Sequence, residues 1–233
     1  WEAAARNMET LLLPTATDTL VAAARLVVSG EFWQALWTSN QALLAGFPAA
    51  CVAGGLLGLA LGRSRILAAW LEVHLHIVLA VPKTAVIPLI VMAFGFGLRS
   101  RAIVIFAFAF PIIAVTVQAG LEPVDARLIA MARAFCATER QIWWRVLLPA
   151  ALPAVMTGLR LGLVRAIAGM VAVELTLIAV GLGRLLLQFR ADFDAAALFA
   201  TVLMVMAEAG AQNQLAAALE RRTGSFNANA MPE

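Results

Sequence analysis

The chain has few charged residues and few of the side chains from which enzyme active sites are built. Only 13% of its 233 residues are charged, against about 25% in a typical soluble domain. It has no tyrosine, two histidines, two cysteines and a single lysine. Hydrophobic residues instead make up 63% of the chain, and the mean hydropathy is +0.90. A soluble domain of this length has no means of burying so much apolar surface, so the composition predicts an integral membrane protein.

The few reactive side chains do not form an enzyme site or a metal site. Cys51 lies in a hydrophobic run and Cys136 in a polar segment, so neither a disulfide nor a Cys-x-x-Cys unit is predicted. His74 and His76 are two residues apart and point to different sides of a helix, so they do not share one metal ion. With Glu72 they are expected at a membrane interface. The sequence therefore predicts no metal and no catalytic residues.

The single lysine does not belong to a phosphate-binding loop. Such a loop needs a glycine directly before the lysine and another five residues earlier. Pro82 and Ile77 occupy those positions before Lys83. The chain is therefore predicted to bear no ATP site of this kind and no cofactor of its own, so an ATP-driven process would need a separate ATPase subunit.

The basic residues are scattered rather than gathered in one patch. The net charge is +3 and the isoelectric point is about 9.6, but no basic stripe with interleaved aromatic residues occurs, so no nucleic-acid partner is predicted. Anionic lipid headgroups explain the charge better. Placing the polar segment 122–149 in the cytoplasm gathers eight basic residues on that side against six opposite, with Arg101 and Arg184 among the six. This is a small positive-inside excess.

Five apolar runs are long enough to cross about 30 Å of hydrocarbon at 1.5 Å per residue. Residues 41–219 therefore form the predicted transmembrane domain, with residues 1–40 as an extracytoplasmic amphipathic lead-in and residues 220–233 as a cytoplasmic tail. Within the lead-in, Pro14 and Ser29-Gly30 are expected breaks. The expected spans are 41–61, 70–98, 102–121, 151–181 and 195–219.

A polar, arginine-bearing segment separates the third and fourth of these runs. From Val124 to Pro149, apolar and charged residues recur at helical spacing, which predicts two short helices at a membrane surface. Pro149 and Pro153 are expected to close the segment and to open the next span. So long an amphipathic insert between spans indicates a docking site for a partner.

Four stretches of sequence carry a resemblance to a known family. They read AVPKTAVIPLIVMAFGFG at 80–97, QIWWRVLLPAALP at 141–153, TGLRLGL at 157–163 and VAVELTLIAVGLGRLL at 171–186. In this order they resemble permease subunits of bacterial ATP-binding-cassette importers, within the nitrate, sulfonate and taurine branch. At the motif that defines the family, Ala130-Met131-Ala132 stands where Glu-Ala-Ala is usual, and Cys136 stands where glycine is usual.

The resemblance implies an all-α integral membrane fold with five core transmembrane helices of the type I importer kind. It implies a cytoplasmic coupling loop, similar to the family's EAA loop, over 122–149. Relatives usually carry one more span, so a further span is expected before residue 1. The part of the loop implied to contact the ATPase consists of Arg133, Ala134, Phe135, Cys136, Ala137, Thr138, Glu139 and Arg140.

The same resemblance implies the partners and the location. They are ATP-binding-cassette ATPase subunits that bind ATP and Mg²⁺, an extracytoplasmic substrate-binding protein and a second permease copy, giving a homodimer. The complex would lie in the bacterial inner membrane and import a small, anionic solute of the nitrate, sulfonate or taurine class.

Three ionisable residues within apolar runs are candidates for the pore or its gate: Lys83, Arg165 and Glu174. A charge near the bilayer centre costs at least about 2.5–3.5 kcal/mol, so it faces protein or water. Arg165 and Glu174 are nine residues apart and lie on opposite faces of one helix. Their partners must therefore come from other helices or from a second subunit. A role in the pore and a role in a structural ion pair both remain open.

Glycines recur every four residues in the first span. Gly54, Gly58 and Gly62 form a stripe of small residues on one helix face, which is typical of close helix packing in membranes. Gly46 is expected to lie outside this contact.

Two other classes of function compete with the importer subunit. A secondary transporter or channel working alone explains the spans and the buried charges, but not the amphipathic insert. A membrane-bound enzyme would need a metal or nucleophile site that the sequence does not offer.

Overall fold

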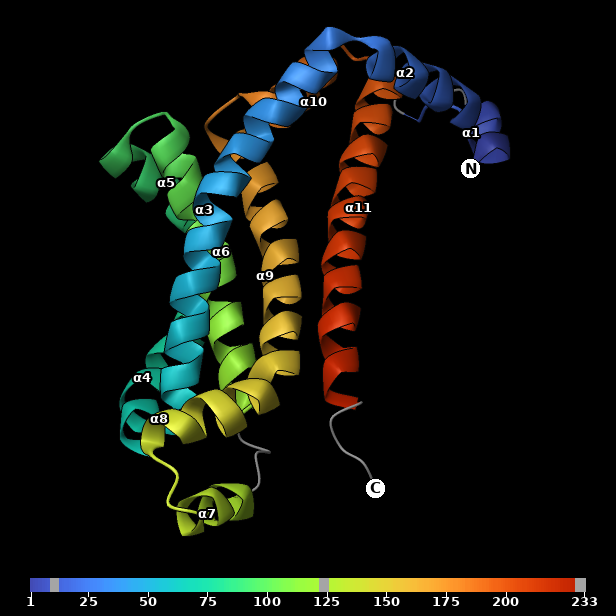
Figure 1. Ribbon diagram of the computed structural model, residues 1–233. Helices are drawn as coiled ribbons and strands as arrows, with labels where there is room; N and C mark the ends of the chain where they lie inside the picture. The colour runs from blue at the N-terminus through green and yellow to red at the C-terminus, as the bar shows by residue number, and fades with distance from the viewer. Residues whose placement is uncertain (9–12, 122–125, 229–233) are drawn as a thin grey trace. The chain divides into compact units, whose positions relative to one another are not determined.

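The computed structural model describes residues 1–8, 13–121 and 126–228, and these form helices joined by short turns (Figure 1). Throughout those three ranges no β-strand occurs. The helices are α1 (Glu2–Met8), α2 (Ala16–Val28), α3 (Gly30–Arg63), α4 (Arg65–Ala80), α5 (Lys83–Phe94), α6 (Leu98–Ala119), α7 (Ala126–Ala134), α8 (Glu139–Ile142), the π-helix η1 (Trp143–Leu147), α9 (Leu148–Thr176), α10 (Gly181–Ala191) and α11 (Ala195–Ala228).

Four helical stretches of the described chain are long and apolar enough to cross a membrane: Gly30–Arg63, Leu98–Ala119, Glu139–Thr176 and Ala195–Ala218. The expected span at 70–98 is instead the pair α4 and α5, which passes the same test only when its two members are taken together. The break falls at Val81-Pro82, where Val81 adopts an extended conformation with ψ 129°. Proline disfavours helical geometry at the residue before it, which explains the break. The spans number five when this pair is counted as one.

Two expected boundaries differ from the observed ones. The expected break at Ser29-Gly30 is present, but α3 then runs without interruption from Gly30, so the boundary drawn between residues 40 and 41 lies inside a helix. Pro149 does not interrupt the chain, which stays helical from Glu139 to Thr176. The five-residue π-helix directly before α9 explains this, because its wider turn accommodates a proline ring that a regular helix does not.

The chain forms two compact units. Unit 1 comprises residues 1–46, 83–105 and 166–212, and unit 2 comprises residues 47–82, 106–165 and 213–233. One apolar cluster in unit 1 is built on Phe32, Ala35, Leu182 and Leu185. Unit 2 has a cluster of Leu61, Leu75 and Ala114 and another of Leu121, Ile142, Leu147 and Ala151.

The glycine stripe of α3 lies against α6 and the residues that follow it in unit 2. A Cβ atom at Gly54 would lie 2.8 Å from the carbonyl oxygen of Phe110, and one at Gly62 would lie 2.6 Å from Cδ1 of Leu121. At Gly58, the nearest atom is the carbonyl oxygen of Ala114, at 2.5 Å. Since Cβ atoms do not approach other heavy atoms this closely, only glycine allows the observed distance between the two helices.

The expectation for Gly46 is wrong. A Cβ atom there would collide with the carbonyl oxygen of Ala102, which also belongs to α6. The four-residue repeat in fact begins at Gly46 and continues through the buried Ala50, so the small-residue face of α3 is longer than the three glycines suggest.

Gly55 offers a matched control for the contact at Gly58. It lies on the same helix, and no atom lies within 4 Å of the place where its Cβ would be. We expect Gly55→Ala to raise the thermal midpoint, because alanine is favoured over glycine in helices by about 1 kcal/mol. Gly58→Ala should lower the midpoint despite the same gain, since α6 must move away. Thermal unfolding of the two purified variants in detergent measures this difference, and equal midpoints would contradict the packing assignment.

Candidate coupling loop and intramembrane charges

The turn between α7 and α8 is only four residues long, from Phe135 to Thr138 (Figure 1). Cys136 lies in the left-handed region, with φ 55°. Its N–H donates to the carbonyl oxygen of Arg133 at 2.9 Å, and the N–H of Ala137 donates to that of Ala132 at 3.0 Å. These two bonds form a Schellman motif, which terminates α7. The left-handed position in this motif favours glycine, and glycine is the residue that the resemblance leads one to expect there.

The far side of the turn is closed by a capping box. The N–H of Gln141 donates to Oγ1 of Thr138 at 3.3 Å, and the N–H of Thr138 donates to Oε1 of Gln141 at 2.8 Å. Two backbone donors at the start of α8 are thus satisfied reciprocally. With a helix stop on one side and a helix start on the other, the turn has little conformational freedom.

The outer face of this turn is exposed and its inner face packs on unit 2. Phe135 is 81% exposed, although it is a large aromatic residue. On the inner face, Ala132 and Ala137 pack against the cluster that contains Ile142 and Leu147. Among the eight residues predicted to contact the ATPase, Ala137 is half-buried and the other seven are exposed.

Glu139 links the turn to two other helix ends. Its Oε2 lies 2.9 Å from Nη2 of Arg63 at the end of α3, and its Oε1 lies 2.8 Å from Nη2 of Arg133 on α7. Solvent screens these exposed pairs, so their contribution to stability is small. Their effect is on orientation, because one carboxylate fixes both α7 and α3 relative to the first residue of α8.

Glu174, a candidate gate residue, is completely buried in unit 1. Its Oε2 accepts hydrogen bonds from Oγ of Ser39 at 2.8 Å and from the N–H of Gly183 at 3.1 Å. Its Oε1 lies 3.4 Å from Nη1 of Arg101. Arg101 also donates from Nη1 to the carbonyl oxygen of Thr38 at 3.0 Å. The partners of Glu174 thus come from α3, α6 and α10, and not from its own helix.

The same cluster caps α10. Val180 precedes this helix and has no side-chain acceptor to offer. Ser39 accepts from the N–H of Leu182 at 3.0 Å, and Glu174 accepts from that of Gly183. These are donors of the first helical turn, which have no partner within their own helix, and a carboxylate is favourable at this positive end.

Both glycines of the Gly-Leu-Gly sequence are needed for this approach. A Cβ atom at Gly181 would collide with Oγ of Ser39, and one at Gly183 would collide with Cβ of Glu174. Gly181 also has φ 58°, which side chains other than glycine rarely adopt.

The sequence reasoning missed most of this cluster. Ser39 is not among the predicted site residues, and Arg101 was counted among the basic residues on the extracytoplasmic side. Both are buried, so Arg101 is not a solvent-exposed loop charge. The one available signal was a Gly-Leu-Gly sequence seven residues after an intramembrane glutamate, because it indicates a close backbone approach.

The other two candidate pore residues have different surroundings. Lys83 is half-buried at the first residue of α5. Arg165 is exposed on α9 and has no ion-pair partner among the residues that the structure describes. Its neighbour along the helix, Arg160, is paired: Nη1 lies 3.4 Å from Oε2 of Glu220, and Nε donates to Oδ1 of Asn213 at 3.0 Å.

A further polar group joins α3 to α11 within unit 1. Oε1 of Glu208 accepts from Nδ2 of Asn40 at 2.6 Å and from Nε2 of Gln212 at 2.9 Å. Nε2 of Gln212 also donates to Oδ1 of Asn40 at 3.1 Å. None of these three residues is among the predicted site residues, because Asn40 lies 168 residues from Glu208 in the sequence and no local pattern relates them.

The histidines lie apart from any metal-binding group. Nδ1 of His74 lies 2.9 Å from the carbonyl oxygen of Trp70, and Nε2 of His76 lies 3.9 Å from Oε1 of Glu72. Within residues 1–8, 13–121 and 126–228, no three His, Cys, Asp or Glu residues are grouped so that they would hold a metal ion.

Comparison with known proteins identifies the class. Residues 46–224 match the family described as binding-protein-dependent transport system inner membrane component. The chain is 29% identical to the putative aliphatic sulfonates transport permease protein SsuC of Bacillus subtilis, over 91% of this chain and 76% of that protein. It is 31% identical to the taurine transport system permease protein TauC of Escherichia coli, over 67% of this chain and 57% of that protein.

A solved structure shows the same fold. A chain of the MetNI methionine ABC transporter, in an inward-facing conformation, matches with a TM-score of 0.68 at 22% identity, covering 85% of this chain and 96% of that one. The predicted fold class, an all-helical permease of the type I importer kind, is confirmed. The predicted resemblance to the nitrate, sulfonate and taurine branch is confirmed as well.

The buried position of Glu174 leads to a stability prediction. Glu174→Gln keeps the size of the side chain but leaves Arg101 as a buried cation without its counter-ion, for which losses of about 3–5 kcal/mol are typical. We expect a much lower yield of folded protein and a lower thermal midpoint. Glu31→Gln is the control, because it removes the exposed ion pair with Arg184 in the same unit and should change little. Equal effects of the two substitutions would show that Glu174 does not organise unit 1.

Proposed function

Because the chain belongs to the family of inner membrane components of binding-protein-dependent transport systems, we propose that two copies of it form one translocation path for a small anion. The chain is a multi-pass protein of the inner membrane and a transport subunit rather than an enzyme. In this family the ATPase and the substrate-binding protein are separate partners. Family membership favours this function over a transporter or channel that works alone.

The geometry of the turn from Phe135 to Thr138, called the coupling turn from here on, carries the proposal that the ATPase docks there. Phe135 and Cys136 are exposed at the tip of a turn that is fixed by hydrogen bonds on both sides. A rigid tip with an exposed aromatic residue is suited to fill a groove on a partner. Glu139 ties the same turn to Arg63 at the end of α3, so a displacement of the tip is passed to a membrane-spanning helix. ATP-driven closure of the ATPase would then move the turn as a rigid body.

The proposed solute is a small anion that bears a sulfonate or a similar group. The two relatives described above are named for taurine and for aliphatic sulfonates, which share that group. The position of Arg165 in this chain also supports an anionic solute. A cation on an apolar helix needs water or protein around it, and within the described chain Arg165 has no ion-pair partner. A water-filled path between two copies would supply that environment, and its positive potential would attract anions.

Substitutions at Cys136 test the docking. Cys136→Trp places a bulky side chain at the tip and in a left-handed backbone conformation, so substrate-stimulated ATP hydrolysis should be lost while the permease stays folded. Cys136→Gly should keep full stimulation, because glycine removes a left-handed cost of roughly 1–2 kcal/mol. The assay uses proteoliposomes with the ATPase and the binding protein. Native mass spectrometry of the same complex should show two copies of this chain.

A second substitution separates docking from a local folding effect. Phe135→Ala removes the exposed anchor without straining the backbone, and it should weaken co-purification of the ATPase. Unchanged stimulation in both Cys136→Trp and Phe135→Ala would reject the turn as the docking site, and a complex with one copy of this chain would reject the homodimer.

Substitutions at Arg165 and Arg160 together test whether Arg165 lines the translocation path. Arg165→Gln should lower anion transport and leave assembly and basal ATP hydrolysis intact, because its charge has no partner to lose. Arg160→Gln should instead lower the assembled yield, since it removes the ion pair with Glu220 and the hydrogen bond to Asn213. Uptake of radiolabelled taurine per assembled complex measures the difference. Normal uptake per complex in Arg165→Gln would remove this residue from the path.

A further inference from the structure

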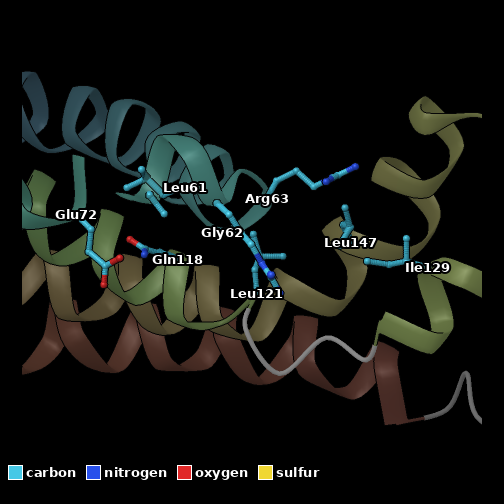
Figure 2. A pocket seen from close by; sticks show the side chains of 10 residues that line it. Leu61, Gly62, Arg63, Glu72, Gln118, Leu121, Ile129 and Leu147 are labelled. Atoms are coloured by element: carbon cyan, nitrogen blue, oxygen red, sulfur yellow. The ribbon is translucent and has the colours of Figure 1, made fainter. Parts of the chain in front are cut away.

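Unit 2 contains a pocket at the place where the ends of α3 and α6 meet α4 and α7 (Figure 2). Its volume is about 400 Å³, which lies within the range of small-molecule sites. The apolar part of its lining comes from Leu61, Leu121, Ile129 and Leu147, and the polar part from Arg63, Arg65, Glu72 and Gln118.

Gln118 gives the first indication of a ligand. Its side chain is buried, with only 7% of the residue exposed, and its Oε1 has no hydrogen-bond donor within the described residues. In Figure 2 this side chain lies on the same side of the pocket as Glu72. A buried acceptor without a donor costs about 1–3 kcal/mol, and such atoms are rare in native proteins. The pocket therefore offers an acceptor that a ligand N–H would satisfy.

The charges in the lining have both signs. Arg65 is exposed and has no carboxylate partner in the part of the chain that the structure covers. Arg63 is already paired with Glu139, which leaves Arg65 as the available cation. Glu72 lies seven residues after Arg65 on α4, and a separation of seven residues places the two on the same helix face. Nε2 of His76 lies 3.9 Å from Oε1 of Glu72.

We propose that this pocket binds a zwitterion that carries a phosphate and, two carbons away, a primary ammonium group. The guanidinium of Arg65 binds the phosphate, and the ammonium donates to Oε1 of Gln118 and to the carboxylate of Glu72. This phosphoethanolamine group has two possible sources, the headgroup of a phospholipid and the free compound. The proposal is independent of the transported solute.

The pocket is in contact with the coupling loop. Ile129 on α7 and Leu147 on η1 form part of its wall, and Figure 2 shows both at the end opposite Glu72. An occupant therefore touches α4, α6 and α7 together. Its binding should slow the exchange of α7 backbone amides with deuterated water, since Ile129 of α7 forms part of the pocket wall.

The lipid source is tested by native mass spectrometry of the full-length protein in detergent. The protein is incubated with equal amounts of phosphatidylethanolamine and phosphatidylcholine that have the same acyl chains. Both headgroups are zwitterions, but only the first has N–H donors. Loss of a hydrogen bond to a charged group weakens binding roughly tenfold or more. We therefore expect the protein to retain phosphatidylethanolamine in preference to phosphatidylcholine by about that factor.

The free compound is tested in nanodiscs of pure phosphatidylcholine. Calorimetric titration compares phosphoethanolamine with phosphocholine, its trimethylated counterpart. Binding of phosphoethanolamine here assigns the site to a soluble ligand, and retention only in the mass spectrometric experiment assigns it to the lipid. If neither ammonium compound is preferred over its trimethylated counterpart, the pocket holds only water and the proposal is overturned.

Three variants locate the binding. Gln118→Leu removes the acceptor at similar size, and Gln41→Leu on the exposed face of α3 is its control. Glu72→Gln is a second test at a half-exposed side chain, in case Gln118→Leu does not fold. We expect the preference to vanish in Gln118→Leu and Glu72→Gln and to persist in Gln41→Leu. A preference that survives in both pocket variants would overturn the assignment, whatever the outcome of the transport assays.

Discussion

The fully buried carboxylate of Glu174 is the constraint on which unit 1 depends. An ionised carboxylate away from water is tolerated only when its oxygens are satisfied by donors and a counter-ion. Here the counter-ion is Arg101 on α6, and the donors are Ser39 on α3 and the backbone of Gly183 on α10. One side chain of α9 therefore fixes the positions of three other helices. It also supplies the cap that the sequence of α10 lacks, since Val180 has no acceptor to offer.

Unit 2 is held together by a different kind of contact. Gly54, Gly58 and Gly62 bring the backbone of α3 against α6, where dispersion forces act over many atoms at short range. The carboxylate of Glu139 in this unit is exposed and joins helix ends rather than helix centres. Unit 1 has a close backbone contact of this kind at Gly46 as well and adds the buried ion pair to it. In unit 2, the exposed ion pairs of Glu139 set the orientation of the coupling turn.

The coupling turn shows how a departure from the family pattern is accommodated. Cys136 takes the left-handed position that glycine normally fills, and the Schellman bonds to Arg133 and Ala132 form nevertheless. The cost of about 1–2 kcal/mol for a left-handed residue is offset by the capping box of Thr138 and by the packing of Ala137. The geometry on which ATPase docking would depend is therefore kept without the glycine.

The spans and one helix-packing face of this protein could be predicted from the composition of the sequence and the period of the α-helix. Apolar runs of more than 18 residues identify spans because the bilayer thickness fixes their length, and a small residue at every fourth position indicates close packing because the helix period is fixed. The two short helices of the amphipathic loop were predicted from the helical spacing of its apolar residues. The break at Val81-Pro82 was missed because the run 70–98 is long enough and apolar enough overall to pass for one span despite Glu72 and Lys83. The helical path through Pro149 was missed because a π-turn leaves no pattern in sequence. Only tertiary structure separated the three candidate charges, burying Glu174 with Arg101 and leaving Arg165 exposed. The sequence shows that the charge of Glu174 lies in a span. Its partner Arg101 is 73 residues away on another helix, and no local period relates the two.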